Sequence, residues 1–162
     1  YTTLFRSTII GLGKILSTVV VGRLSSSGFI KSKKRVMFIG TAAYTATWAV
    51  ICVFVSEINS YTFWAVVCAG FGFFGGFMTL SFTQVKEWFP VAISGTTVAA
   101  MNVFLFLGAA LGTSLSSAIM GKTYEMGNFT LLWQIMLLLS VAATVLIALS
   151  RERQMPAVAG KD

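Results

Sequence analysis

The sequence predicts an all-α membrane protein, a polytopic helix bundle with five spans. Of its 162 residues, 56% are hydrophobic and only 10% are charged, and the mean hydropathy is +0.84. A soluble domain has roughly 45–50% apolar and about 25% charged residues. In addition, five stretches are long and apolar enough for a transmembrane helix, which needs about 20 mostly apolar residues.

The five expected spans follow one another through most of the chain. The first contains a lysine, Lys14, and the fourth is long enough to tilt or to end in the membrane interface. Together they predict one transmembrane domain over residues 1–150, followed by a tail at 151–162. The expected spans are 7–24, 36–55, 62–83, 94–120 and 130–150.

Basic residues are concentrated in alternate connectors. Nine of the twelve Lys and Arg residues lie beside or within connectors 25–35 and 84–93 or in the tail. Of the other three, only Arg6 and Lys122 lie at the opposite ends of the spans, and Lys14 lies within a span. Cytoplasmic loops carry an excess of Lys and Arg. The sequence therefore predicts an integral, multi-pass protein of a plasma or inner membrane, with a cytoplasmic C-terminus.

The same composition argues against several other functions. The chain has no histidine, and its five acidic residues all lie in expected loops or in the tail. It therefore lacks an acid pair or a nucleophile–base constellation for an intramembrane enzyme. Its two cysteines lie inside apolar runs and predict no metal site. We expect no catalytic residue, no metal, no cofactor and no nucleic-acid partner.

Two segments resemble cytoplasmic motifs of the major facilitator superfamily. In the first, Gly22 ends one span and the cluster Lys33-Lys34-Arg35 opens the next, although Ser26 stands where the family has an acid. The second is Glu87-Trp88-Phe89-Pro90, followed by Gly95-Thr96 and Asn102. It is similar to the segment between the tenth and eleventh helices of that family.

This resemblance implies that the spans are helices eight to twelve, the C-terminal portion of a twelve-helix transporter fold. The chain opens with Tyr1 and is expected to be a fragment, whose partner is a missing N-terminal helix bundle. The resemblance also implies a conformational gate. Because Ser26 replaces the family's acidic residue, this gate is expected to be weaker or unused. The alternatives are a purely topogenic basic loop and an ordinary solvated helix start. The implied gate residues are Gly22, Ser26, Lys33, Lys34, Arg35, Glu87 and Pro90.

Two pairs of glycines have the spacing of helix-packing motifs. Gly72 and Gly76 form one GxxxG pair, and Gly108 and Gly112 form another. Small residues four positions apart let a neighbouring backbone approach closely. We expect close helix packing at both pairs. The alternative is that residues 70–76 bend during alternating access, because glycines weaken a helix.

Lys14 is the leading candidate for substrate binding. An ionised lysine at the membrane centre costs roughly 2.5–3.5 kcal/mol on insertion scales, and such residues usually face a cavity or a counter-charge. The alternative is that its amine snorkels to the outer interface. Asn102, Phe73 and Phe106 are further candidates, with helix packing or lipid contact as their alternatives.

These features favour the C-terminal half of a secondary active transporter that moves a small molecule by alternating access. A lone cation in the membrane favours an anionic solute. The bilayer, the missing helix bundle and this substrate are then the expected partners. The alternative is a non-transporting integral membrane scaffold or assembly subunit.

Overall fold

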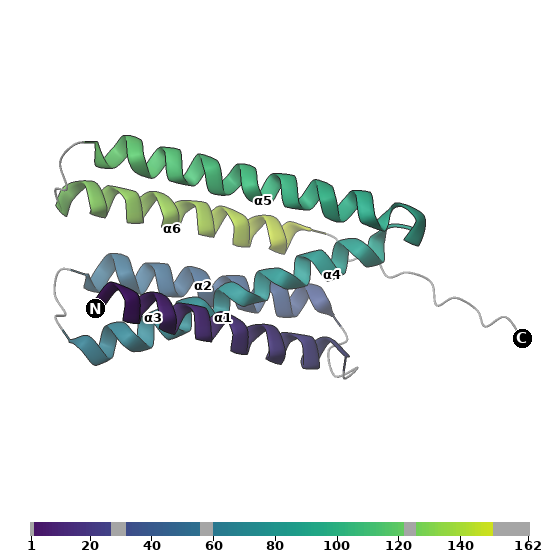
Figure 1. Ribbon diagram of the computed structural model, residues 1–162, viewed down its shortest axis with the longest axis horizontal. Coiled ribbons are helices and arrows are strands. Elements are labelled where there is room, and N and C mark those ends of the chain that lie inside the picture. The colour runs from purple at the N-terminus through teal and green to yellow at the C-terminus, as the bar shows by residue number, and fades with distance from the viewer. Residues whose placement is uncertain (1, 27–31, 56–59, 122–125, 151–162) are drawn as a thin grey trace, which may run out of the picture.

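The computed structural model describes residues 2–26, 32–55, 60–121 and 126–150, and all regular structure there is helical. Figure 1 shows long helices that run roughly side by side. Very hydrophobic sequence without internal proline favours this arrangement, because only helices and closed barrels satisfy every backbone group in lipid. The elements are α1 (Thr2–Ser26), α2 (Lys33–Phe54), α3 (Tyr61–Gly75), the 3₁₀ helix η1 (Gly76–Met78), α4 (Thr79–Trp88), α5 (Val91–Met120) and α6 (Met126–Leu149).

Five helical segments are long and apolar enough to cross a membrane, which confirms the predicted fold class. The third consists of α3, η1 and most of α4, joined end to end. Most helices begin a few residues before the apolar span expected from sequence. The polar first turn of α2, Lys33-Lys34-Arg35, belongs to the helix although it contributes little hydrophobicity. The segments are Leu4–Arg23, Lys33–Phe54, Tyr61–Lys86, Val91–Met120 and Gly127–Leu149.

The helices form two groups (Figure 1). The antiparallel pair α5–α6 lies on one side, and α1, α2, α3 and α4 lie on the other. α1 packs chiefly against α3, whereas α2 lies between α3 and α6 and contacts both. One end of the bundle carries Arg23, Lys33, Lys34, Arg35 and Lys86, and is called the basic end below.

The closest helix contact joins α1 to α3 and η1, and we call it the glycine seam (Gly13, Ser17, Gly72 and Gly76). A methyl group on Gly13 would lie 2.7 Å from the Ala69 carbonyl oxygen, and one on Gly72 would overlap the Ile10 carbonyl. A methyl group on Gly76 would lie 2.5 Å from the Ser17 hydroxyl. The two backbones therefore touch directly, as small residues in membrane helices allow.

The 3₁₀ helix η1 also contacts α2. Phe77 packs against Gly40 so closely that any β-carbon at Gly40 would overlap its ring. Phe77 also joins Val21, Met37 and Leu80 in the buried hydrophobic cluster of the described residues. The short stretch Gly76–Met78 thus contacts α1 through a glycine and α2 through a phenylalanine.

Hydroxyl groups connect α2 to α6. The Thr45 Oγ1 lies 3.2 Å from the Ser140 carbonyl oxygen, to which it donates, and 3.0 Å from the Thr144 Oγ1. Hydrogen bonds between membrane helices stabilise a helix pair by roughly 0.6 kcal/mol on average. This polar contact holds the α5–α6 pair on the rest of the bundle.

Replacement of Gly72 by alanine tests the glycine seam. Because its new methyl group would meet backbone atoms of Ile10, we expect Gly72→Ala to lower the free energy of unfolding by about 1–3 kcal/mol. An SDS titration followed by tryptophan fluorescence measures this change.

Gly11→Ala is the matched control, since Gly11 lies on α1 and its new methyl group would meet nothing within 4 Å. Alanine favours a helix by about 1 kcal/mol over glycine, so this variant should be as stable as the parent or more so. Equal stabilities for Gly72→Ala and Gly11→Ala would contradict the close contact.

Candidate functional site

Lys14 lies in the middle of α1, one residue from the glycine seam. Its side chain is exposed, and it makes no ion pair or hydrogen bond within the described part of the chain. Its backbone carbonyl accepts a hydrogen bond of 2.9 Å from the Thr18 hydroxyl. Lys14 therefore lies within a candidate membrane span, and no described residue forms an ion pair or a hydrogen bond with its amine.

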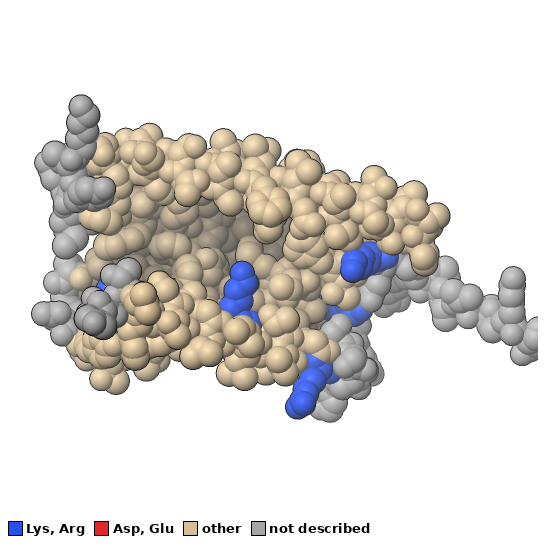
Figure 2. Space-filling model, in the orientation of Figure 1, with Lys and Arg blue, Asp and Glu red and all other residues tan. Residues whose placement is uncertain are grey.

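The face shown in Figure 2 is hollowed between the α5–α6 pair and α1, and a basic side chain lies at the edge of the hollow on the α1 side. No acidic side chain is described: four of the five acids lie in segments 56–59, 122–125 and 151–162, and the fifth is Glu87. Among the described residues, this face therefore presents positive charge and apolar surface.

The other three predicted substrate residues are spread over two helices. Phe73 lies on α3, where its ring packs 5.5 Å from that of Phe74 and 5.6 Å from that of Phe77. Asn102 and Phe106 both lie on α5, and both side chains are exposed. Asn102 and Phe106 are four residues apart, so they share one face of the helix. Phe73 is instead part of the packing around η1.

The predicted gate residues gather at the basic end. Gly22 is exposed near the end of α1, and Ser26 is its last residue. Pro90 is the N-cap of α5, exposed, and its position matches the preference of proline for helix starts. Glu87 lies in α4, but its side chain is outside the described part of the structure, as is that of Ser26.

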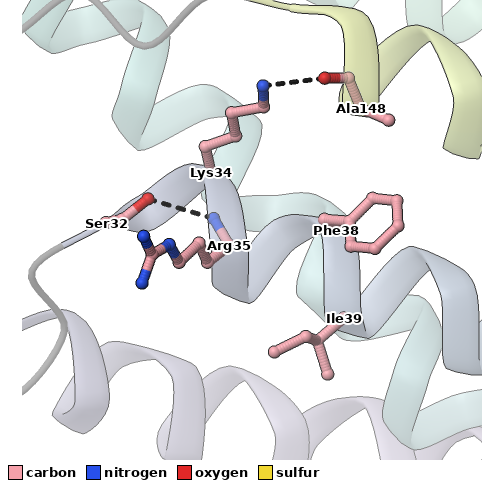
Figure 3. Close-up of a pocket in the computed structure, with 6 residues that line it drawn as sticks. All are labelled: Ser32, Lys34, Arg35, Phe38, Ile39 and Ala148. Carbon is pink, nitrogen blue, oxygen red and sulfur yellow. Dashed lines mark hydrogen bonds between the residues drawn. The ribbon is translucent and has the colours of Figure 1, made fainter.

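Lys34 holds the C-terminus of α6. Its Nζ donates to the Ala148 carbonyl oxygen at 2.8 Å (Figure 3). It also donates to the carbonyl oxygen of Ser150. The last carbonyls of a helix have no partner within the helix, and a nearby cation also favours the negative end of the helix dipole. One member of the basic cluster thus has a structural partner inside this chain.

The first turn of α2 positions the cluster. Ser32 is its N-cap, and the Ser32 hydroxyl accepts a hydrogen bond of 3.3 Å from the Arg35 backbone N–H. The Arg35 guanidinium is exposed and makes no hydrogen bond or ion pair within the described residues. Lys34 and Arg35 therefore differ: one caps α6, and the other remains available.

The two glycine pairs lie in different surroundings. Gly72 and Gly76 lie in the glycine seam, whereas a methyl group on Gly108 or on Gly112 would meet nothing within 4 Å. α5 has no buried residue along its length. The second pair therefore faces outward from the described helices.

Sequence reasoning missed several residues that position these groups. Gly13 and Ser17 form the α1 side of the seam, and the Ser17 hydroxyl is fully buried without a hydrogen-bond partner in the described structure. The signal was available, because Gly13 and Ser17 are small residues four apart. Gly40 and the Thr45–Thr144 pair had no comparable signal, since isolated glycines and threonines are common in membrane helices.

The fold and the basic end define an integral, multi-pass membrane protein, without a cluster of metal-ligating side chains among the described residues. The sequence model of the Major Facilitator Superfamily matches residues 5–161, nearly the whole chain. The chain belongs to the Major Facilitator Superfamily, and it is a transporter of that type. This family is one of transporters rather than enzymes. No curated protein and no solved structure matches the chain.

Removal of the Lys34 amine tests the cap on α6. We expect Lys34→Gln to speed hydrogen exchange of the last α6 amides several-fold, because two carbonyls lose a charged donor. Hydrogen–deuterium exchange with mass spectrometry measures peptides that cover residues 141–150.

Arg35→Gln removes a neighbouring charge without removing such a bond and serves as the control. If both variants exchange at the same rate over residues 141–150, the Lys34 amine does not cap α6.

Proposed function

We propose that this chain is the C-terminal half of a secondary active transporter that moves a small anionic solute by alternating access. The observation that carries the proposal is the family match over residues 5–161. In such transporters two helix bundles rock against each other around a site near the membrane midplane. The N-terminal bundle would be the partner, and the C-terminus of this chain would lie in the cytoplasm.

Lys14 is the proposed substrate-binding cation. Its place in the middle of α1 puts its Cα roughly 18 Å from either end of the helix, since each residue adds about 1.5 Å. Charged residues at this depth commonly mark substrate or ion pathways. A cation without a described counter-charge favours a carboxylate or a phosphate ester.

Asn102 and Phe106 are proposed to line the same solute pathway from α5, where both are exposed on one helix face. An amide can donate to and accept from a polar solute, and an aromatic ring can cover its apolar part. Phe73 is not part of this proposed lining, because its ring packs against the rings of Phe74 and Phe77.

The basic end is the proposed site of a conformational gate. Gly22, Ser26, Glu87 and Pro90 lie there on helices that meet at one end of the bundle. Lys34 is committed to α6, and Ser26 supplies no charge at the position of the family's acid. The proposed gate combines these residues with Lys33, Arg35 and residues of the partner bundle.

A transport assay tests the role of Lys14. We expect Lys14→Ala to lower the uptake of anionic solutes by proteoliposomes at least tenfold relative to the parent. Lys14→Arg should keep measurable uptake because the charge remains. The assay uses a panel of radiolabelled dicarboxylates and sugar phosphates, with neutral sugars for comparison.

Arg6→Ala is the control, because Arg6 is an exposed cation of the same helix and lies near the N-terminus of α1. Membrane insertion of each variant is checked by carbonate extraction. If Lys14→Ala transports anions as well as Arg6→Ala does, Lys14 is not a substrate residue. If no solute is transported by the parent when both bundles are present, the scaffold function replaces the transporter.

A further inference from the structure

A cavity of about 530 Å³ lies at the basic end, between the first turns of α2 and the last turn of α6. Its lining combines two cations with apolar side chains (Figure 3). It is lined by neither Lys14, Asn102 nor Phe106. It shares Lys34 and Arg35 with the proposed gate, but that gate includes no bound ligand. The lining residues are Ser32, Lys34, Arg35, Phe38, Ile39 and Ala148.

We propose that this cavity binds the headgroup phosphate of an anionic phospholipid, with an acyl chain along Phe38 and Ile39. The first argument is charge. Lys33, Lys34 and Arg35 are consecutive, and two of them, Lys34 and Arg35, line the cavity. Basic pockets between membrane helices near the headgroup level are suited to anionic lipid headgroups.

The second argument is that the two cations that line the cavity differ in their hydrogen bonds. The Lys34 amine bonds to the carbonyls at the end of α6, whereas the Arg35 guanidinium makes no hydrogen bond or ion pair within the described residues. The planar guanidinium presents five N–H donors, which match a phosphate in a bidentate manner. Arg35 is therefore the phosphate-binding residue of the proposed site.

The third argument is the apolar wall. Phe38 is 39% exposed and Ile39 is 63% exposed, immediately on the membrane side of Arg35 along α2. A soluble anion would gain nothing from these side chains. A phospholipid would place its phosphate at Arg35 and continue along Phe38 and Ile39 toward the bilayer centre. The amphipathic character of the lining therefore favours a lipid over free phosphate.

Native mass spectrometry of the protein in detergent micelles tests the proposal. Phosphatidylglycerol and phosphatidylcholine with identical acyl chains are added at equal concentration. We expect the parent to retain phosphatidylglycerol preferentially and Arg35→Gln to bind it about fivefold more weakly, which corresponds to about 1 kcal/mol. Arg35→Lys should keep part of the preference because the charge remains.

Arg6→Gln is the matched control, since it removes the same charge at the opposite end of the bundle and should leave lipid binding unchanged. Ile39→Trp, which fills the cavity, should weaken binding of phosphatidylglycerol without changing the net charge. The unfolding midpoint of each variant is measured in parallel, so that loss of fold is not read as loss of binding.

Three results would overturn the proposal. One is equal retention of phosphatidylglycerol by Arg35→Gln and Arg6→Gln. Another is displacement of the lipid by equimolar inorganic phosphate, which would indicate a site for a free anion. The last is a dimer that dissociates in Ile39→Trp, which would assign the cavity to contact with a second copy of the chain.

Discussion

The bundle depends on the direct backbone contact between α1 and α3. In lipid, apolar side chains gain little by leaving their surroundings, so helices associate through close packing and hydrogen bonds instead. Gly13, Gly72 and Gly76 remove the side chains that would separate the two backbones. The contact positions α1 along its length and therefore determines where Lys14 lies. Loss of this contact would allow α1 to move away from α3, and Lys14 would move with it.

Packing and polar contacts together join α6 to the rest of the bundle. Thr45 connects α2 to α6, and the Lys34 amine connects the start of α2 to the end of α6. α5 contacts mainly α6 and the end of α4, and no residue along α5 is buried. The helices α1, α3, α2 and α6 thus pack against one another in sequence, whereas α5 is held by fewer contacts and its faces are open.

The sequence predicted the number, order and type of the spans, because hydrophobicity over about 20 residues determines whether a helix can cross a membrane. It also singled out Gly72 and Gly76, since their spacing is visible locally. It did not predict Gly40 against Phe77, because this contact depends on the 3₁₀ turn at Gly76–Met78 and on the approach of a distant helix. The helices extend a few residues beyond the predicted apolar spans, since polar first turns such as that of α2 carry no hydrophobic signal. The candidate site residues were identified by chemistry alone, and their arrangement depends on helix contacts that one sequence does not reveal.

Cysteine cross-linking in native membranes tests the α1–α3 contact most directly. The rings of Phe5 on α1 and Tyr61 on α3 lie 5.3 Å apart, so cysteines at these positions are within reach of a short bifunctional thiol reagent. With Cys52 and Cys68 replaced by alanine, we expect Phe5→Cys/Tyr61→Cys to cross-link in high yield, as a shift in electrophoretic mobility after proteolysis between the helices. The pair Phe5→Cys/Leu131→Cys, which joins α1 to α6, should cross-link poorly. Equal yields for the two pairs, or none for the first, would contradict the central place of this contact.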